Sequence, residues 1–110
     1  MTLTDAPKRI QLRRTKGWRM PPNTVKVTRP GRWENPFCVT QYVAPGKKVA
    51  GWLIAVPTVE DAVECFRIMM HERPEYLEEA RQELRGKNLG CWCKLGEPCH
   101  ADVLLEIANA

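Results

Sequence analysis

The 110-residue sequence predicts a small α/β or α+β domain in which one sheet of about four strands is covered by three helices. Three observations predict this class: short segments of alternating apolar residues in the first half, helical spacing of apolar residues after residue 58, and a last strand followed by a helical C-terminus. The length suits a single core. We expect residues 1–8 to be a flexible lead-in and residues 9–110 to form one domain.

The strands are expected mainly in the first half of the chain. Valines alternate with polar residues over Thr24–Arg29, which is typical of a half-buried strand. The Pro- and Gly-containing segment Arg29–Phe37 predicts a defined loop. Phe37–Val43 and Val49–Val56 flank a Pro-Gly pair at 45–46, so we expect them to form a β-hairpin.

Two helices are predicted next. Thr58 is a good N-cap with Asp61 three residues on, and apolar residues then recur at helical spacing to about His71. Pro74 suits the first position of a second helix, and Gly86 is placed to end it.

The C-terminal part predicts one more strand and one more helix. Asn88–Trp92 has the length and apolar content of a short strand. The last apolar segment predicts a helix with Pro98 in its first turn and Cys99 beside it.

Composition and charge limit the classes of function. No apolar run approaches the roughly 18 residues that span a bilayer, and the first residues do not resemble a signal peptide. We therefore expect no membrane partner and a cytoplasmic location, the host cytoplasm if the gene is carried by a phage. Residues 1–32 hold nine basic side chains and one acidic one, whereas residues 33–110 hold eight basic and twelve acidic ones. This segregation indicates that the first third faces an anion.

The segment CWCKLGEPCH (Cys91–His100) holds three of the five cysteines and one of the two histidines. One interpretation is a zinc site formed by Cys91, Cys93, Cys99 and His100, although two cysteines on one strand face need a bend at Trp92 for both to reach one ion. Adjacent Cys99 and His100 also rarely reach the same ion.

A second interpretation is a reactive or ligand-binding site. A loop between a strand and a helix N-terminus presents unpaired N–H groups, and a thiol in the first helical turn, such as Cys99, typically has a lowered pKa. The candidate catalytic residues are Cys93, Cys99, His100 and Asp102. A third interpretation makes these cysteines small buried apolar residues, as we expect for Cys38 and Cys65. The sequence leaves all three open.

The first third interleaves cations with tryptophan. Arginine binds phosphate and tryptophan stacks on bases, so this composition predicts contacts with a nucleotide or a nucleic acid strand. The candidate ligand-binding residues are Arg14, Lys16, Trp18, Arg19, Arg29, Arg32, Trp33 and Asn35. We expect the Arg29–Phe37 loop and the Cys91–His100 segment to meet in one pocket, because each is a constrained turn next to a strand end.

Three blocks of the chain are similar to a known family. Arg14–Phe37, Leu84–Cys93 and Pro98–Asn109 resemble a small family of bacterial and phage proteins described as domain of unknown function 4326. The first block follows the family pattern Gly-Arg-Pro-x-x-Trp-Gly-Asn-Pro-Phe, except that Thr28 replaces the first glycine of the pattern and Glu34 the second. The resemblance implies no particular activity.

Two functions therefore follow from the sequence. The first is binding of a nucleotide or nucleic acid phosphate by the basic, aromatic first third together with the Cys/His segment, with or without catalysis. The alternative is a non-enzymatic module that binds a host protein and uses the cysteines as a structural staple, zinc being the metal such ligands bind. The chain has no P-loop, dinucleotide glycine fingerprint, HExxH pair or nucleophile elbow. The oligomeric state and any reaction are left open.

Overall fold

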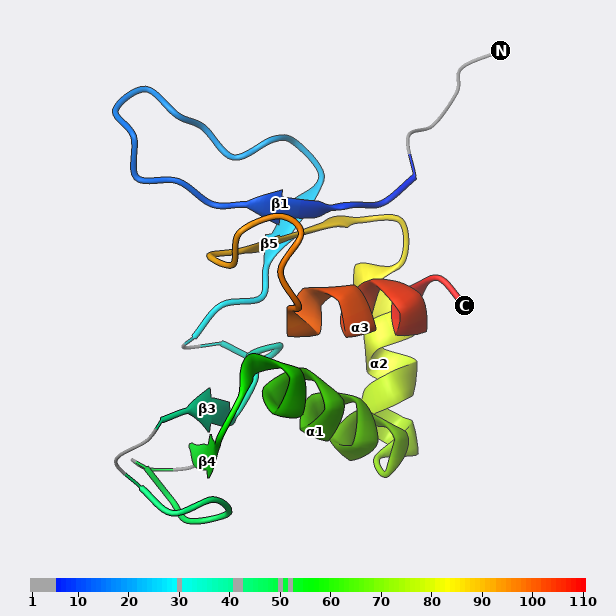
Figure 1. The fold of residues 1–110 in the computed structure, drawn as a ribbon. Helices are drawn as coiled ribbons and strands as arrows, with labels where there is room; N and C mark the ends of the chain where they lie inside the picture. The colour runs from blue at the N-terminus through cyan, green and yellow to red at the C-terminus, as the bar shows by residue number, and fades with distance from the viewer. Residues whose placement is uncertain (1–5, 30, 41–42, 50, 52) are drawn as a thin grey trace.

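The computed structural model describes residues 6–29, 31–40, 43–49, 51 and 53–110. Within these residues the chain forms a mixed α/β domain, which confirms the predicted class (Figure 1). Residues 1–5 of the predicted lead-in lie outside the described part, while Lys8 already bonds to the strand that begins at Asn88. In chain order the elements are β1 (Arg9–Gln11), β2 (Thr24–Lys26), β3 (Phe37–Val39), β4 (Ile54–Val56), α1 (Val59–His71), α2 (Pro74–Leu84), β5 (Asn88–Cys91) and α3 (His100–Ala108).

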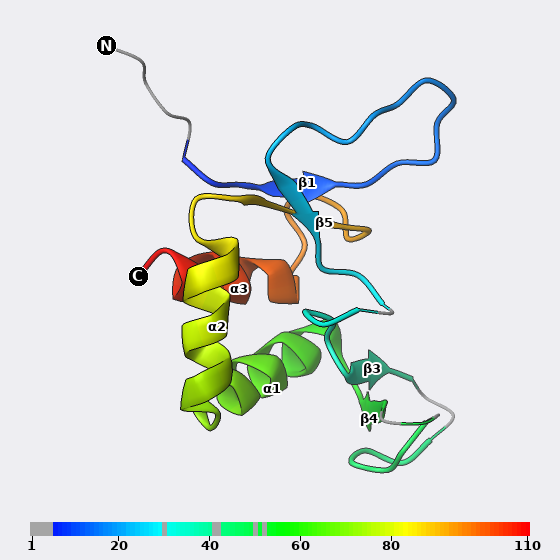
Figure 2. The same cartoon turned by 180° about the vertical axis from the view of Figure 1, so that it is seen from behind.

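The larger sheet has three parallel strands in the order β1-β5-β2. The late strand β5 is central, and its Leu89 lies opposite both Arg9 of β1 and Val25 of β2. Because β1 and β2 point the same way, residues 12–23 must return from the end of β1 to the start of β2. We call this segment the basic loop. It projects from the body of the molecule on the side of the sheet away from α3 (Figures 1 and 2).

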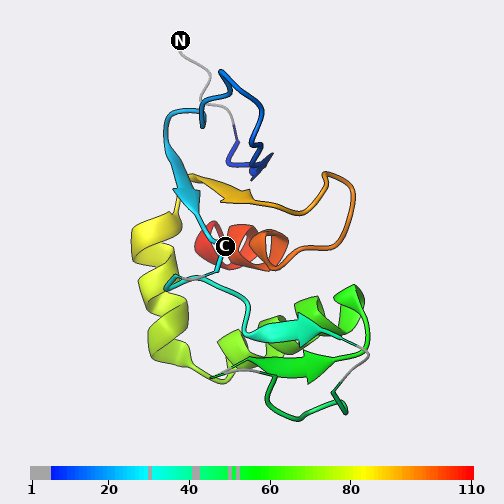
Figure 3. The same ribbon diagram turned by 90° about the vertical axis from the view of Figure 1, so that its left-hand side faces the viewer.

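The predicted hairpin is wrong, because β3 and β4 are parallel and form a separate two-stranded sheet (Figure 3). Gly46, with φ of +83°, does make a turn, but a second reversal follows, in which the Val49 N–H donates to the Leu53 carbonyl at 2.8 Å. Lys48 pairs antiparallel with Ile54. Two reversals in succession bring β4 back alongside β3 in the same direction. The described residues thus form two sheets, whereas one sheet was predicted.

The helices begin and end close to their predicted positions. The Thr58 side chain caps α1 by accepting the Asp61 N–H at 3.1 Å, and Pro74 is the first residue of α2. Gly86 follows the end of α2 with φ of +77°, a conformation that favours glycine. The last helix differs: α3 begins at His100 with Cys99 as its N-cap, so Pro98 precedes the helix.

The core lies between the helices and the central strand. α3 packs against β5, β1 and both other helices, and α1 packs against β3 and β4. Fully buried side chains from α1, α2, β5 and α3 meet there, among them Phe66, Met70, Leu84, Leu89 and Leu104. Burial of such side chains stabilises the fold by about 1.5–3 kcal/mol each. The first residues of α3 are thereby held rigidly beside the end of β5.

Candidate functional site

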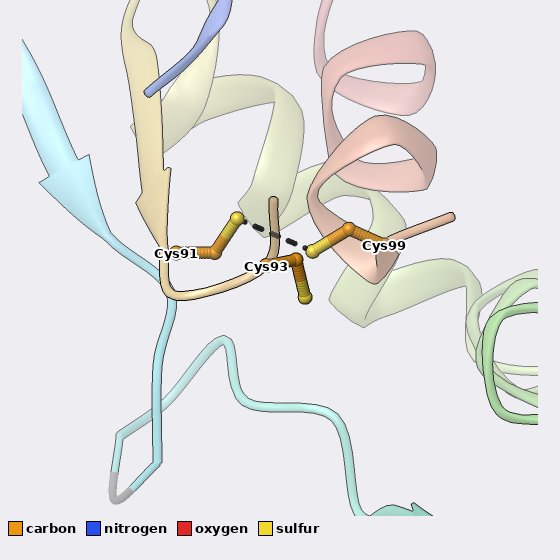
Figure 4. A group of neighbouring side chains, drawn as sticks. All are labelled: Cys91, Cys93 and Cys99. Atoms are coloured by element: carbon orange, nitrogen blue, oxygen red, sulfur yellow. Dashed lines mark hydrogen bonds between the residues drawn. The ribbon is translucent and has the colours of Figure 1, made fainter. Parts of the chain in front are cut away.

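The cysteines of the Cys/His segment converge at the end of the central strand. β5 ends at Cys91, and the chain bends at Trp92 and Cys93, which supplies the bend that the zinc interpretation requires. The Sγ atoms of Cys91, Cys93 and Cys99 all lie within 4.8 Å of one another, and those of Cys91 and Cys99 are 3.3 Å apart (Figure 4). We call these three residues the cysteine cluster.

The cluster faces a pocket of about 420 Å³ at the carboxyl ends of β2 and β5. This is the edge of a parallel sheet at which α/β proteins commonly bind ligands. All three cysteines line the pocket, as do Arg29 and Asn35 from the loop after β2. The two segments that were expected to meet therefore share a pocket. Its other walls come from β3 and the start of α1, including Phe37, Val39, Val59 and Val63.

His100 is not part of the cysteine cluster. Its Nε2 lies 2.8 Å from the Val27 carbonyl oxygen and 3.0 Å from that of Trp33. Because carbonyl oxygens only accept hydrogen bonds, Nε2 carries the proton and donates to both. Nδ1 is 3.8 Å from the Sγ atom of Cys99. Burial lowers the pKa of the imidazole and keeps it neutral.

The thiols of the cluster differ strongly in acidity. The pKa of Cys93 is lowered because the thiols of Cys91 and Cys99 donate hydrogen bonds to its sulfur. The pKa of Cys99 is raised because its thiol is held as a donor to Cys91 and Cys93 and is buried. The sequence-based expectation of a lowered pKa at Cys99 is therefore wrong: Cys99 is the N-cap of α3, and its neighbouring sulfurs outweigh the helix terminus.

Asp102 lies outside the pocket of the cysteine cluster. Its carboxylate is 2.8 Å from the guanidinium of Arg9, which also donates to the carbonyls of Lys94 and Glu97 at 2.8 and 2.7 Å. The Arg9 side chain is only 7% exposed. Arg9 thus ties the turn at 94–97 to β1 and to α3, and Asp102 belongs to this tie.

Four predicted ligand-binding residues have their side chains committed elsewhere. Arg29 donates to the carbonyls of Asn35 and Phe37, and Arg32 pairs with Glu79 and Glu83 on α2. The other two, Trp33 and Asn35, are both buried. The Trp33 ring stacks on that of Tyr76 with centroids 4.9 Å apart, and the Asn35 amide bonds to the backbone of Ala62 and Phe37. These side chains hold the loop after β2 in place.

The cations of the basic loop, unlike Arg29 and Arg32, are exposed and form no ion pair with the described residues. These cations are Arg13, Arg14, Lys16 and Arg19. Gly17, with φ of +86°, makes the turn at the tip, where the Trp18 N–H donates to the Thr15 carbonyl at 3.0 Å. Trp18 itself is half-buried.

Trp92, which was not among the predicted site residues, joins the basic loop to the Cys/His segment. Its side chain is 47% exposed and lines the pocket of the cysteine cluster. The guanidinium carbon of Arg14 lies 4.8 Å from the centroid of the Trp92 ring, in the range of a cation–π contact. The position of Trp92 directly after a strand, between two cysteines, was the available signal.

A comparison with family models places this arrangement in a known group. The model described as Domain of unknown function (DUF4326) matches residues 10–110. The chain belongs to this family. The resemblance seen in the three sequence blocks is thereby confirmed. Searches of curated proteins and of solved structures found no match.

Both segments of interest lie inside the DUF4326 match, since it includes the basic loop and the whole Cys/His segment. Of the described residues of this DUF4326 domain, none belongs to a helix that is long and apolar enough to cross a membrane. The domain presents two separate features. One is the basic loop, whose cations form no ion pair with the described residues and which lies next to the exposed Trp92. The other is the cysteine cluster, which faces a pocket.

Proposed function

We propose that this domain binds a single-stranded nucleic acid through the basic loop and Trp92. The observation that carries the proposal is the contact between Arg14 and Trp92, which joins the basic loop to an exposed aromatic ring. Cations along a backbone path combined with an aromatic ring for stacking are the two elements of single-strand binding that do not depend on sequence.

The charge distribution supports phosphate as the partner of the basic loop. Residues 12–23 contain four cations and no acidic residue, so no internal carboxylate competes for them. By contrast, the arginines of α1 and α2 already have partners: Arg67 pairs with Glu64 and Glu106, and Arg81 pairs with Glu78. Binding of phosphates to the basic loop would release counterions without breaking an ion pair.

Trp92 supports a strand rather than an isolated phosphate. Base stacking on an exposed aromatic ring contributes about 1–3 kcal/mol, and it requires a ring held in position. Trp92 directly follows Cys91, the last residue of β5, so the strand holds the backbone on that side of it. Arg14 lies over the indole ring. A base that replaced Arg14 over this ring would leave the guanidinium free to pair with its phosphate. The other predicted partners and roles, a host protein and catalysis by Cys93, Cys99, His100 and Asp102, stay predictions.

The test measures binding of a fluorescently labelled, single-stranded oligonucleotide by anisotropy at several salt concentrations. The test variant combines alanine substitutions of Arg13, Arg14, Lys16 and Arg19. A control variant with the same loss of charge replaces exposed cations far from the loop along the chain, namely Lys47, Lys48, Arg73 and Arg81. We expect the test variant to lose most affinity and its salt slope to fall by about 0.7 per lost phosphate contact, whereas the control keeps the wild-type slope.

A second pair of variants separates stacking from charge. Trp92→Ala should weaken binding by about 1–3 kcal/mol, and Trp92→Phe should restore part of it. Equal affinity and salt slope for the test and control variants would show that the basic loop is not the binding surface. Equally tight binding of a mononucleotide would contradict a strand as the ligand.

A further inference from the structure

We propose that the cysteine cluster is a metal centre in which Cys91, Cys93 and Cys99 bind one Zn²⁺ ion and leave its fourth coordination position open to the pocket. Three segments of the chain contribute: the end of β5, the bend after it and the N-cap of α3 (Figure 4). The inference is independent of nucleic acid binding, because the basic loop supplies none of the three ligands.

The sulfur positions are close to those of a zinc site. With Zn–S bonds of about 2.3 Å, tetrahedral coordination places sulfurs about 3.8 Å apart. The Cys91 and Cys99 sulfurs are 3.3 Å apart, and no pair in the cluster exceeds 4.8 Å. Side-chain rotations that change the sulfur–sulfur separations by about one ångström or less would therefore bring all three sulfurs to the spacing of a zinc site. Thiolate is a soft ligand and selects Zn²⁺ over Mg²⁺ or Ca²⁺.

The chain supplies three ligands rather than the four of a structural zinc site. Among the described residues the group of ligand atoms contains only the three cysteines. His100, the predicted fourth ligand, donates Nε2–H to Val27 and Trp33. Zinc sites with three protein ligands keep an exchangeable position for solvent or substrate. All three cysteines line the pocket, so this position faces it.

The chemistry of the site selects a thiol for the open position. Three thiolates outweigh the charge of Zn²⁺, which disfavours a phosphate dianion, and a soft metal–thiolate centre favours another sulfur donor. The pocket wall is largely apolar at Phe37, Val39 and Val63, and Arg29 is its cation. In the exchange, the incoming thiol gives its proton to solvent, a Zn–S bond forms and the bound water leaves.

The first experiment measures metal content and affinity. Protein purified without chelators is analysed by native mass spectrometry, and zinc affinity is measured by competition with a chromophoric chelator. We expect one zinc per chain and an affinity loss greater than about 100-fold for Cys93→Ser, since loss of an outer-shell partner alone costs 10–100-fold. Cys93 is only half-buried, so this variant has the best prospect of folding, which circular dichroism checks.

A further cysteine provides a matched control. Cys65→Ser removes a half-buried thiol that lies outside both the cluster and its pocket, so it should keep wild-type zinc affinity. Zinc should also protect Cys91, Cys93 and Cys99 from alkylation in the wild type without changing the reactivity of Cys65. Equal zinc affinity in the wild type and Cys93→Ser, or an equal loss in Cys65→Ser, would overturn the metal centre.

A second experiment tests the open position. Co²⁺ replaces Zn²⁺, and its visible and sulfur-to-metal charge-transfer bands report the number of sulfur ligands. Addition of a small thiol should increase the charge-transfer absorption by about one third, because three sulfur ligands become four. A spectrum that is unchanged by saturating thiol would overturn the open position, and with it this proposal. Neither outcome bears on oligonucleotide binding, which is measured separately.

Discussion

The Nε2 atom of His100 lies 2.8 Å from the carbonyl oxygen of Val27. The same atom is 3.0 Å from the carbonyl oxygen of Trp33. One imidazole N–H, fixed at the start of α3, thus holds both ends of the segment that follows β2. The Phe66 ring meets the imidazole edge-on with centroids 5.0 Å apart. His100 is therefore a central support of the pocket.

Replacement of His100 should destabilise the domain substantially. His100→Ala leaves two carbonyls without their donor and opens a void beside Phe66, so we expect the free energy of unfolding to fall by about 3 kcal/mol. The control is His71→Ala, since His71 is exposed and its Nδ1 lies 2.8 Å from the carbonyl oxygen of Arg67, one turn earlier in its own helix. Urea unfolding measures both; losses of similar size would contradict the supporting role of His100.

Arg9 should matter more for stability than its ionic partner Asp102. Arg9→Gln removes donors to two carbonyls and a carboxylate, and we expect a loss of about 2 kcal/mol. Asp102→Asn removes only the carboxylate of a pair that is 53% exposed on the Asp102 side, so its effect should stay below about 1 kcal/mol.

Limited trypsin digestion provides a local readout for the same pair. Arg9→Gln frees the turn at 94–97, so cleavage after Lys94 should become faster than in Asp102→Asn. Faster cleavage in Asp102→Asn would show that the carboxylate, and not the two carbonyl contacts, holds the turn.

Asn35 is predicted to be structural. Its Nδ2 donates to the Ala62 carbonyl at 3.1 Å, and its Oδ1 accepts the Phe37 N–H at 2.9 Å. Asn35→Ala should lower the melting temperature, because the buried Ala62 carbonyl and the half-buried Phe37 N–H both lose their partner. Asn35→Asp keeps the acceptor but removes the donor and buries a charge, so it should be at least as damaging. An Asn35→Asp variant as stable as the wild type would exclude this role.

Oxidation of the metal-free protein should first form a disulfide within the cysteine cluster, with Cys93 as one partner. Cys93 is the half-buried thiol of the cluster and the one whose pKa is lowered, and its sulfur lies within 4.8 Å of those of Cys91 and Cys99. Peptide mapping after mild oxidation should identify this disulfide ahead of any that involves Cys38 or Cys65. A dominant disulfide between Cys38 and Cys65 would show that the cluster does not persist in solution.

Tyr76 makes stability depend on alkaline pH. Burial raises the pKa of Tyr76 above its ordinary value of 10.0, so the fold favours the protonated phenol. Its contribution is complete below pH 10 and is lost as the pH rises further, because the unfolded chain ionises first. Tyr76→Phe, which also loses the hydrogen bond to the Arg32 carbonyl, should be less stable by about 1 kcal/mol at neutral pH. The difference should narrow above pH 10; a constant difference would contradict the pKa shift.

The parts of the fold that depend on neighbouring residues were predictable. The Thr58 cap, Pro74 at the start of α2 and the presence of a strand from Asn88 all follow from local preferences. The parallel pairing of Phe37 with Ile54 was not, because the Pro-Gly turn is a local signal and the second reversal carries no comparable one.

The candidate site was predictable in composition but not in the roles of its residues. The sequence singled out the Cys91–His100 segment and the basic first third, and the structure brings three of those cysteines together. The partners of His100 and Arg9 are far away in the chain: Val27 lies 73 residues from His100, and Asp102 lies 93 residues from Arg9. Pairings over such separations are decided by packing of the whole chain and leave no local pattern.

The central position of β5 has a consequence for synthesis of the chain. In the described part of the larger sheet, β1 and β2 pair only with β5, which is made from residues 88–91. During translation β1 and β2 are therefore made long before their sheet partner exists. The positively charged segment that contains them stays without this pairing until residues 88–91 have been synthesised.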